Sequence, residues 1–427
     1  MSASPTSPAA FLRALFDRAV AVADPMRSLA AHLPPRPAGR VVVVGAGKAS
    51  ARMAEAVEAA WGPCEGLVIT RYGYARPCQR IEIVEAAHPV PDAAGAAATA
   101  RMLARLKELG PDDVVLALIS GGASALLVAP VEGVTLAQKQ ALNAALLASG
   151  APIDRMNTVR KHLSRVKGGQ LAAAAWPARM LTLMISDVPG DDPAMIGSGP
   201  TVGEASHAAD ALAVLAQWQV AAPGAVRAAL ARGSSVVAPQ DPRLARVENH
   251  IYAAPAQSLA AAAAMARAAG CDVRLLGDAL EGEARELAVQ HGALARSIRA
   301  GLPPGAAPVL LLSGGELTVT RRGDGVGGPN AEYCLALALA LNGAAGIHAL
   351  ACDTDGVDGA AEVAGAQISP DTLAQAAQAG AAPAAAPAAA LARNDAHGFF
   401  AAIGGQVVTG PTLTNVNDFR AILILPH

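Results

Sequence analysis

Four consecutive valines, Val41–Val44, lead directly into a glycine turn with a lysine at its tip, Gly45-Ala46-Gly47-Lys48. An alanine-rich segment with helical periodicity follows from Ser50. This pattern predicts a buried strand, a tight turn and the exposed N-terminus of a helix. Free backbone N–H groups, the positive end of the helix dipole and the lysine ammonium would all attract an anion there. The sequence therefore predicts that this turn binds a phosphate, or a carboxylate next to one.

The turn differs from two well-known phosphate-binding motifs. A P-loop requires a glycine at the position that Val42 occupies. The dinucleotide-binding fingerprint accepts Ser50 only imperfectly, and it requires an acidic residue after a second strand, for which Glu65 comes too early. A nicotinamide-binding turn and an ordinary tight turn between a strand and a helix stay open as alternatives.

The composition restricts the class of protein. A chain of 427 residues is long enough for two domains with separate cores, and a net charge of −2 gives no indication of a nucleic-acid surface. The five cysteines form no CxxC pair, so neither a zinc site nor a disulfide framework is predicted. Glycine turns interrupt the charge-free stretches 114–131 and 334–352, and the chain begins without a signal-peptide pattern. We therefore expect a cytoplasmic protein without membrane spans.

Strand and helix patterns alternate along most of the chain. The strand candidates are Arg40–Val44, Gly66–Ile69, Ile81–Ala86, Val114–Ile119, Met180–Ile185, Val273–Leu276, Val309–Leu312, Ile347–Ala351, Val407–Val408 and Ala421–Leu425. The helical patterns are 8–33 (one helix or a pair), 93–109, 135–149, 206–219, 257–269 and 280–300, with a surface helix and turn at 373–392. This alternation predicts α/β layers with parallel sheets, in which functional sites lie at the carboxyl ends of the strands. The segment 233–248 has the composition of a linker, so we expect domains at 1–235 and 245–427.

Four apolar strand candidates end in clusters of Gly, Ser and Asp. The clusters are Ser120-Gly121-Gly122-Ala123-Ser124, Ser186-Asp187-Val188-Pro189-Gly190-Asp191-Asp192, Ser313-Gly314-Gly315-Glu316 and Asp353-Thr354-Asp355-Gly356. Ser-Gly-Gly turns present hydroxyl and N–H donors to oxygen anions. Aspartates at strand ends can hold magnesium or accept a proton from a substrate hydroxyl. Each cluster alone could be a plain turn, but together with Lys48 they are the components of phosphoryl transfer.

A basic segment at 159–169 is a second candidate anion site. Arg160, Ser164 and Lys167 are spaced at i, i+4 and i+7, which would place them on one face of a helix. They would either clamp a substrate carboxylate or ATP phosphates, or form an ordinary solvated helix face. His88, before a proline turn, is either a substrate contact or a structural histidine. No convincing Ser-His-Asp or Cys-His arrangement is present, which disfavours hydrolysis.

With these residues in view, the chain resembles the class II glycerate 2-kinases over nearly its whole length. The motifs that carry the resemblance are Gly45-Ala46-Gly47-Lys48, Gly66–Gly73, Glu85–Asp92, Met156–Ser164, Ser186–Asp192, Ser313–Glu316, Asp353–Gly356 and Thr409–Asp418. The resemblance implies two α/β domains, the first Rossmann-like with a largely parallel sheet and the second a MOFRL domain. It also implies an active site in the cleft between the two domains.

The resemblance implies ATP- and magnesium-dependent phosphorylation of D-glycerate at its 2-hydroxyl. Lys48 would stabilise the transferring phosphoryl group, and Asp187 would orient or deprotonate the attacking hydroxyl or bind magnesium. The candidate substrate and nucleotide contacts are Gly45, Gly47, Ser120, Gly121, Gly122, Ser124, Arg160, Lys167, Ser313, Gly314, Gly315, Glu316 and Asn330, and the candidate metal ligands are Asp187, Asp353 and Asp355. The expected partner is the small-molecule substrate, without nucleic acid or membrane, and a homodimer is left open.

One position departs from the family pattern. Family members usually have Gly-Gly-Arg-Asn where this chain has Gly327-Gly328-Pro329-Asn330. Proline supplies neither charge nor an N–H, so an expected contact to phosphate or carboxylate is missing unless Arg321 or Arg322 replaces it. Loss of a phosphoryl-stabilising arginine can lower the rate roughly 10³-fold. A family member that binds ligands without turnover therefore stays open as an alternative. A hydroxypyruvate reductase with a nicotinamide cofactor also stays open, supported only by the turn at Gly45–Ser50.

Overall fold

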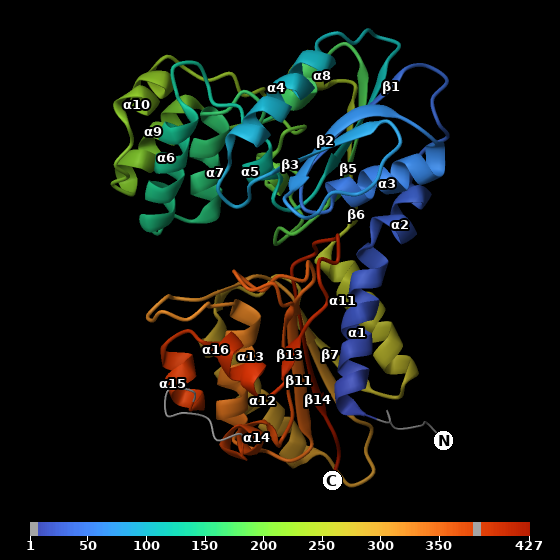
Figure 1. The fold of residues 1–427 in the computed structure, drawn as a ribbon, viewed down its shortest axis with the longest axis vertical. Coiled ribbons are helices and arrows are strands. Elements are labelled where there is room, and N and C mark those ends of the chain that lie inside the picture. Colours follow the sequence, from blue (N-terminus) through green and yellow to red (C-terminus); the bar gives the residue numbers. More distant parts are fainter. Residues whose placement is uncertain (1–6, 379–385) are drawn as a thin grey trace. The chain divides into compact units, whose positions relative to one another are not determined.

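The computed structural model describes residues 7–378 and 386–427 and divides into two compact units (Figure 1). The first domain is Pro25–Tyr252, and the second domain combines Met1–Asp24 with Ala253–His427. The predicted ranges were 1–235 and 245–427. The first unit instead begins at Pro25 and extends to Tyr252, and the residues before Pro25 belong to the second unit. Helix α1 (Pro8–Ala23) packs against α11 (Pro255–Ala268) of the second domain, and β6 (Val247–Ala253) completes the first sheet.

The first sheet has the strand order β3-β2-β1-β4-β5-β6. Its strands besides β6 are β1 (Val41–Ala46), β2 (Glu65–Arg71), β3 (Ile81–Ala86), β4 (Val114–Ile119) and β5 (Arg179–Ile185). The pairs β1–β2, β1–β4, β2–β3 and β4–β5 are all parallel. This is the order of the doubly wound Rossmann fold, in which ligands bind where neighbouring strands β1 and β4 send their connections to opposite sides. The expectation of an α/β first domain with a largely parallel sheet is confirmed.

Helices cover both faces of this sheet, as parallel sheets require. Helix α3 (Ser50–Trp61) packs on one face, and α4 (Ala93–Leu106) and α8 (Gln170–Ala175) pack on the other. Val42 and Val44 lie in one core with Met102 of α4, and all three side chains are fully buried. The run of valines forms a strand because its β-branched side chains fill both faces of the sheet.

A separate group of helices extends the first domain to one side of the sheet in Figure 1. Its members are α6 (Leu136–Ala148), α7 (Ile153–His162), α9 (Ala208–Gln217) and α10 (Gly224–Ala231), which share a core of Leu and Val side chains. Helix α6 begins in a capping box: the Thr135 hydroxyl accepts the Gln138 N–H at 3.2 Å, and the Gln138 side chain accepts the Thr135 N–H at 2.9 Å. This cap fixes which face of α6 is buried, and that face carries Lys139, Leu142 and Leu146.

The sheet of the second domain is mixed, not parallel as predicted. Its order is β13-β12-β11-β14-β9-β7, and only the pair of β7 (Asp272–Gly277) and β9 (Val309–Ser313) is parallel. The remaining strands are β11 (Ile347–Asp353), β12 (Gly365–Ile368), β13 (Gln406–Val407) and β14 (Asp418–Ile424). A loop without a helix joins β11 to β12, and such a connection can only join antiparallel neighbours. Strand–helix alternation indicated the layers correctly but not the direction of these strands.

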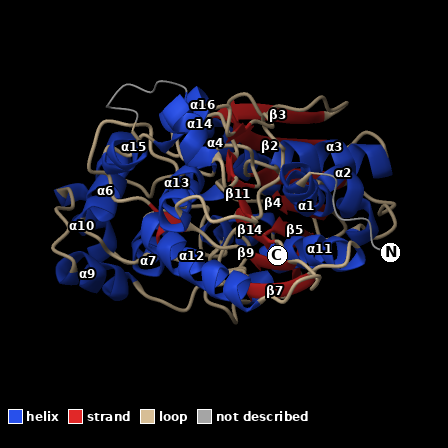
Figure 2. Ribbon diagram, turned by 90° about the horizontal axis from the view of Figure 1, so that it is seen from below, coloured by secondary structure: helices blue, strands red, loops and turns tan. Residues whose placement is uncertain are grey.

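Helices α1 and α11 cover one face of the second sheet, and the other face carries α12 (Ala284–Gly301) and α13 (Pro329–Leu341), as Figures 1 and 2 both show. The remaining helices and short elements are α2 (Pro25–Ser28), η1 (Leu29–His32), α5 (Ala123–Leu126), η2 (Ile196–Ser198), η3 (Pro242–Leu244), β8 (Gly282–Glu283), β10 (Leu317–Thr318), α14 (Thr372–Gln378), α15 (Pro387–Ala392) and α16 (Ala396–Ala402). Part of the helix and turn expected at 373–392 lies outside the described residues. Within the part of the chain that the structure describes, no helix has the length and apolar character needed to cross a membrane.

Glu58 of α3 fixes the loop that leads into β3. Its carboxylate accepts the N–H groups of Cys64 at 3.1 Å, Arg80 at 2.9 Å and Ile81 at 3.1 Å, and also that of Gln79. Burial acts to raise the pKa of Glu58, but these four backbone hydrogen bonds outweigh it and hold the pKa below its ordinary value. The carboxylate therefore stabilises the folded state in its ionised form.

We expect Glu58→Ala to lower the free energy of unfolding by about 2–4 kcal/mol, because four N–H groups lose their acceptor. Urea unfolding followed by circular dichroism measures this, with exposed Glu108→Ala as the control that should change little. Since the folded pKa is depressed, the stabilisation is present above the unfolded pKa of about 4.3 and is lost as the pH falls through the folded value. A difference in the free energy of unfolding between wild type and Glu58→Ala that persisted unchanged at pH 2 would contradict this account.

Candidate active site

The turns after β1 and β4 are hydrogen-bonded to each other at the topological switch point of the first sheet, where the strand order reverses. The Lys48 N–H donates to the Gly121 carbonyl at 2.8 Å, and the Ala49 N–H donates to the Ser120 hydroxyl at 3.0 Å. Gly47 has a φ of 142°, and a Cβ at that position would overlap the Ser120 hydroxyl. Only glycine meets both requirements, so the predicted glycine turn is essential for this packing.

The side chains of Lys48 and His88 both lie close to Gly122, in the turn after β4. A Cβ at Gly122 would lie 3.1 Å from the His88 ring and 3.3 Å from Cγ of Lys48. The residue also has a φ of +82°, which again favours glycine. The β1 turn, the β4 turn and the loop after β3 therefore meet at one edge of the sheet.

A pocket of about 750 Å³ opens at this edge, entirely within the first domain. Its lining residues come from the loop after β3, from the β4–α5 turn with α5, from helices α6 and α7, and from the turn after α7. They are His88, Pro89, Val90, Pro91, Gly122, Ser124, Ala125, Ala137, Lys139, Gln140, Ala141, Asn143, Ala144, Leu147, Arg160 and Lys167. The volume is in the range of ordinary small-molecule sites.

Three cationic side chains line the pocket, and no lining residue is an aspartate or glutamate. Lys139 and Lys167 are only 3% and 1% exposed, and Arg160 is half-buried. The Lys167 ammonium donates to the carbonyls of Ser124 at 2.7 Å and Leu127 at 3.3 Å, and a guanidinium N–H of Arg160 donates to Asn157 Oδ1 at 3.2 Å. The pocket is therefore electropositive, which suits an anionic ligand.

Burial and mutual repulsion lower the pKa values of these cations. Burial, with a contribution from Arg160, lowers the pKa of Lys139 to about 8. Burial, together with the charges of Lys139, Arg160 and Lys161, lowers the pKa of Lys167 well below its ordinary value. Perturbed pKa values of this kind are typical of functional sites.

Arg160 and Lys167 meet at the pocket, but not on one helix face as the spacing predicted. Helix α7 ends at His162, and the Ser164 hydroxyl accepts the N–H groups of Val166 at 3.2 Å and Lys167 at 3.3 Å. The chain therefore turns after α7 and brings Lys167 back toward the β4–α5 turn. Ser164 is buried in this turn.

Asp187 follows β5 at the same edge of the sheet. The register pairs Ile119 of β4 with Met184 of β5, so the residues just after each strand lie next to one another. Asp187 is half-buried there. This edge of the sheet thus carries the glycine turn with Lys48, the Ser120–Ser124 turn and the Asp187 carboxylate. The sequence analysis expected these three features of the first domain at the carboxyl ends of strands.

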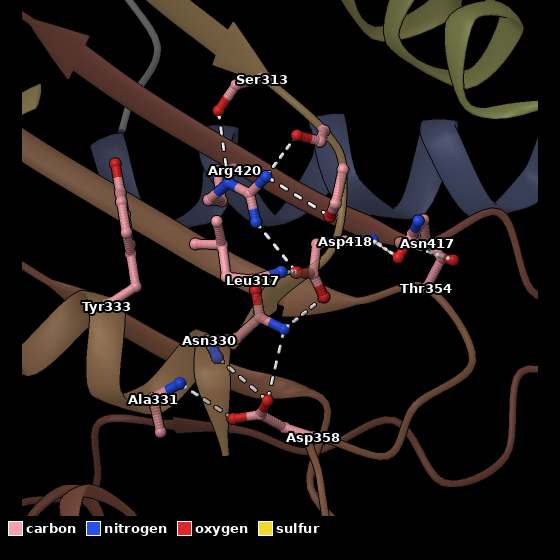
Figure 3. Close-up of polar contacts among 12 residues, drawn as sticks. Ser313, Leu317, Asn330, Ala331, Tyr333, Thr354, Asp358, Asn417, Asp418 and Arg420 are labelled. Atoms are coloured by element: carbon pink, nitrogen blue, oxygen red, sulfur yellow. Dashed lines mark hydrogen bonds and ion pairs between the residues drawn. The ribbon is translucent and has the colours of Figure 1, made fainter. Parts of the chain in front are cut away.

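Ser313, Gly314, Gly315 and Asn330, four of the candidate residues of the second domain, belong to a buried polar network (Figure 3). Arg420 is 1% exposed; its guanidinium donates to the Ser313 hydroxyl at 3.3 Å and to the carbonyls of Gly314 and Gly315, and it pairs with Asp418 at 2.9 Å. The second Ser-Gly-Gly turn therefore directs its oxygen atoms toward an internal cation. Its neighbour Glu316 is exposed.

Asn330 and Asp358 continue this network at the N-terminus of α13. The Asn330 amide donates to Asp418 Oδ1 at 2.6 Å, and the Asp358 carboxylate accepts the N–H groups of Asn330 at 3.0 Å and Ala331 at 2.8 Å. Pro329 stands at the first position of α13, where its missing N–H has no partner to lose. An internal carboxylate thus occupies the positive end of this helix.

Asp353 and Asp355 hold the turn after β11. Asp353 accepts the Asp355 N–H at 2.9 Å, and Asp355, which is fully buried, accepts the Val357 N–H at 2.8 Å. Across residues 7–378 and 386–427, no group of three or more His, Cys, Asp or Glu side chains could hold a metal ion. The assignment of Asp187, Asp353 and Asp355 to magnesium, and the location of the active site between the domains, stay predictions.

Sequence reasoning missed Lys139 and Asn143 of the pocket. Lys139 lies three and seven residues before Leu142 and Leu146, so it occupies the apolar face of α6. A charged residue on the buried face of a helix is a signal that the sequence contains. The predicted anion site included the basic segment at 159–169 but not Lys139.

Comparisons with known proteins agree with this architecture. Residues 11–231 match the model of a domain of unknown function, DUF4147, and residues 309–418 match that of the MOFRL family. A protein of Agrobacterium vitis named "Putative hydroxypyruvate reductase" is 53% identical over 97% of this chain and 94% of its own length. D-glycerate 2-kinase of Thermotoga maritima is 36% identical over 94% of each chain.

A solved structure extends this agreement to three dimensions. The crystal structure of glycerate kinase from Thermotoga maritima superimposes with a TM-score of 0.86 at 34% identity, covering 99% of this chain and 100% of that chain. The match therefore spans both domains. The chain therefore belongs to the class II glycerate 2-kinase family.

Proposed function

We propose that this protein phosphorylates D-glycerate at the 2-hydroxyl with ATP, which gives 2-phosphoglycerate and ADP. The observation that carries the proposal is the electropositive pocket beside Lys48, built at the ligand-binding edge of a Rossmann-like sheet. Relatives named as glycerate kinases support the substrate. The reaction requires stabilisation of phosphoryl charge more than covalent chemistry, and fixed cations supply it.

Lys48 and Asp187 are the residues that we assign to the chemical step. The Lys48 ammonium would neutralise charge that develops on the transferring phosphoryl group. The Asp187 carboxylate would accept the proton of the attacking 2-hydroxyl or orient that hydroxyl. Gly45, Gly47 and the Ser120–Gly122 turn would hold Lys48 in place, since their hydrogen bonds join the two turns.

Magnesium fits this arrangement as a partner of the nucleotide. Proteins commonly bind it through one or two carboxylates together with substrate phosphates and water. Asp187 supplies one carboxylate at the edge of the sheet, so a protein cage of three ligands is unnecessary. The ion would neutralise phosphate charge when bound.

Pro329 does not remove the proposed site, since every cation assigned to it lies in the first domain. Arg321 and Arg322, considered as replacements for the missing arginine, are exposed, and the Arg321 side chain donates to the Gly325 carbonyl of its own loop at 3.0 Å. We therefore propose that the enzyme turns over without an arginine at this position.

A reductase remains the second candidate because a relative that is 53% identical has the name of one. The end of β2, where a nicotinamide-binding fold places an acidic ribose partner, carries Thr70 and Arg71 instead. Arg71 lies over the Tyr74 ring at 5.1 Å. These residues give no acidic partner for the ribose of NAD, whereas an arginine at this position suits the 2′-phosphate of NADP. We favour the kinase because relatives named as glycerate kinases match over both domains.

We expect Lys48→Ala to lower kcat for D-glycerate about 10²- to 10³-fold, because an important charge on the transferring group is then uncompensated. Product formed with ATP and magnesium is measured by conversion with enolase to phosphoenolpyruvate, without added mutase, so that only the 2-phosphate is detected. Exposed Lys107→Ala is the matched control. Equal activity of Lys48→Ala and wild type would exclude the role of Lys48.

The wild-type protein should be active in this assay, and Pro329→Arg should change kcat by less than about tenfold, since α13 already has a carboxylate at its N-terminus. Steady-state kinetics of both proteins measures this. An inactive wild type that gains activity from Pro329→Arg would instead identify a family member that binds without turnover. Hydroxypyruvate-dependent oxidation of NADH or NADPH by the wild type, with no phosphorylation of glycerate, would establish the reductase.

A further inference from the structure

Lys139 is a buried cation without a partner. It lies in the first turn of α6 and is 3% exposed; its backbone N–H donates to the Thr135 carbonyl at 3.0 Å, but its ammonium has no hydrogen bond or ion pair among the described residues. Two other polar atoms of the same pocket are buried and lack hydrogen-bond partners in the described chain, namely Nε of Arg160 and Oδ1 of Asn143. Buried polar groups are normally satisfied, so this set indicates a bound ligand.

The charge of the pocket restricts the ligand. Lys139, Arg160 and Lys167 line it without a carboxylate. The Glu204 carboxylate does not compensate these three cations, because it pairs with Lys161 at 2.5 Å. A single carboxylate would leave two buried or half-buried cations uncompensated, which is unfavourable. A polyphosphate chain carries enough negative charge for all three, and its oxygen atoms accept hydrogen bonds from lysine and arginine alike.

The size and the walls of the pocket point in the same direction. A volume of about 750 Å³ is far more than a three-carbon acid fills. Pro89, Val90 and Pro91 and the alanine face of α6 with Leu147 form apolar walls, and the Gln140 side-chain amide of α6 donates to the Pro91 carbonyl at 2.7 Å, which joins the two segments. Apolar walls next to a cationic end match a ligand that joins a heterocyclic base to phosphates.

We infer that this pocket binds the nucleotide of the proposed kinase reaction, with Lys139, Arg160 and Lys167 on its phosphate oxygens and its base between the proline loop and α6. The inference rests on the proposed function, and it adds Lys139 as a phosphate-binding residue. Gly122, beside the Lys48 stem, lines the same pocket. In this arrangement Lys48 would act on the terminal phosphoryl group.

Binding should also be linked to protonation. Arg160, Lys167 and His88 are the other ionisable groups that line the pocket with Lys139, and no carboxylate lines it to oppose their charge. In the free protein, burial lowers the pKa of Lys139 to about 8, and a bound phosphate would raise it again. Protons are then taken up on binding above neutral pH, so affinity falls as the pH rises through this range.

Isothermal titration of the full chain with ADP and with inorganic tripolyphosphate tests the inference. We expect Lys139→Met to weaken both ligands about tenfold or more, Lys139→Arg to retain most of the affinity, and exposed Lys107→Met to change nothing. Methionine keeps the length of the apolar stem and removes an unpaired buried charge, so folding should persist. In wild type, ADP affinity should fall between pH 7 and pH 9 more steeply than in Lys139→Met.

The KM for D-glycerate separates this inference from the proposed function. If Lys139→Met raises the KM for D-glycerate and leaves ADP affinity unchanged, the cations bind the substrate carboxylate and the inference is overturned. If ADP binding depends on Lys139 but glycerate is never phosphorylated, the nucleotide pocket stands and the proposed function fails. Normal phosphorylation with ADP affinity unaffected by Lys139→Met overturns the inference alone.

Discussion

The first domain depends on the contact between Gly47 and Ser120. This contact joins the turn after β1 to the turn after β4, and the absence of a side chain on Gly47 makes it possible. Because the two turns are joined, Lys48, Gly121 and Gly122 have fixed positions at the ligand-binding edge of the sheet. The cationic pocket is built onto this edge, and its charged end is therefore held by backbone packing and not by flexible loops alone.

The pocket of the first domain and the polar network of the second domain differ in how buried positive charge is compensated. In the second domain, Arg420 is surrounded by acceptors: the Asp418 carboxylate, a serine hydroxyl and two carbonyls. In the first domain, the Lys139 ammonium has no partner among the described residues, and Arg160 has only an amide oxygen for one of its N–H groups. A compensated buried cation stabilises a fold, whereas an uncompensated one destabilises the free protein and favours an anionic ligand. This contrast is why we place the chemistry in the first domain.

The sequence predicted the local features of the site well. The valine run, the glycine turn and the Ser-Gly-Gly cluster specify their structure through β-branching and backbone freedom, both of which are visible in single residues. The direction of β12, β13 and β14 was not predictable from alternation, since it depends on which strands become neighbours. Arg160 and Lys167 were identified for the wrong reason, because a turn after His162, and not helix periodicity, brings them together. Lys139 was missed because its significance depends on the pocket that other segments build around it.

The assignment of α1 to the second domain has a consequence for how the chain is made. Phe11, Leu12, Leu15 and Phe16 pack in one core with residues of α11 and of strands β9 and β14. During synthesis this helix emerges before the first domain, yet its apolar partners emerge only after the entire first domain. The first domain is a continuous segment and can fold before the partners of α1 are synthesised. Until then the apolar face of α1 is exposed to other apolar surfaces. Fragments that begin after Asp24 would leave the matching face of the second sheet uncovered, so a purification tag is better attached ahead of α1 than in place of it.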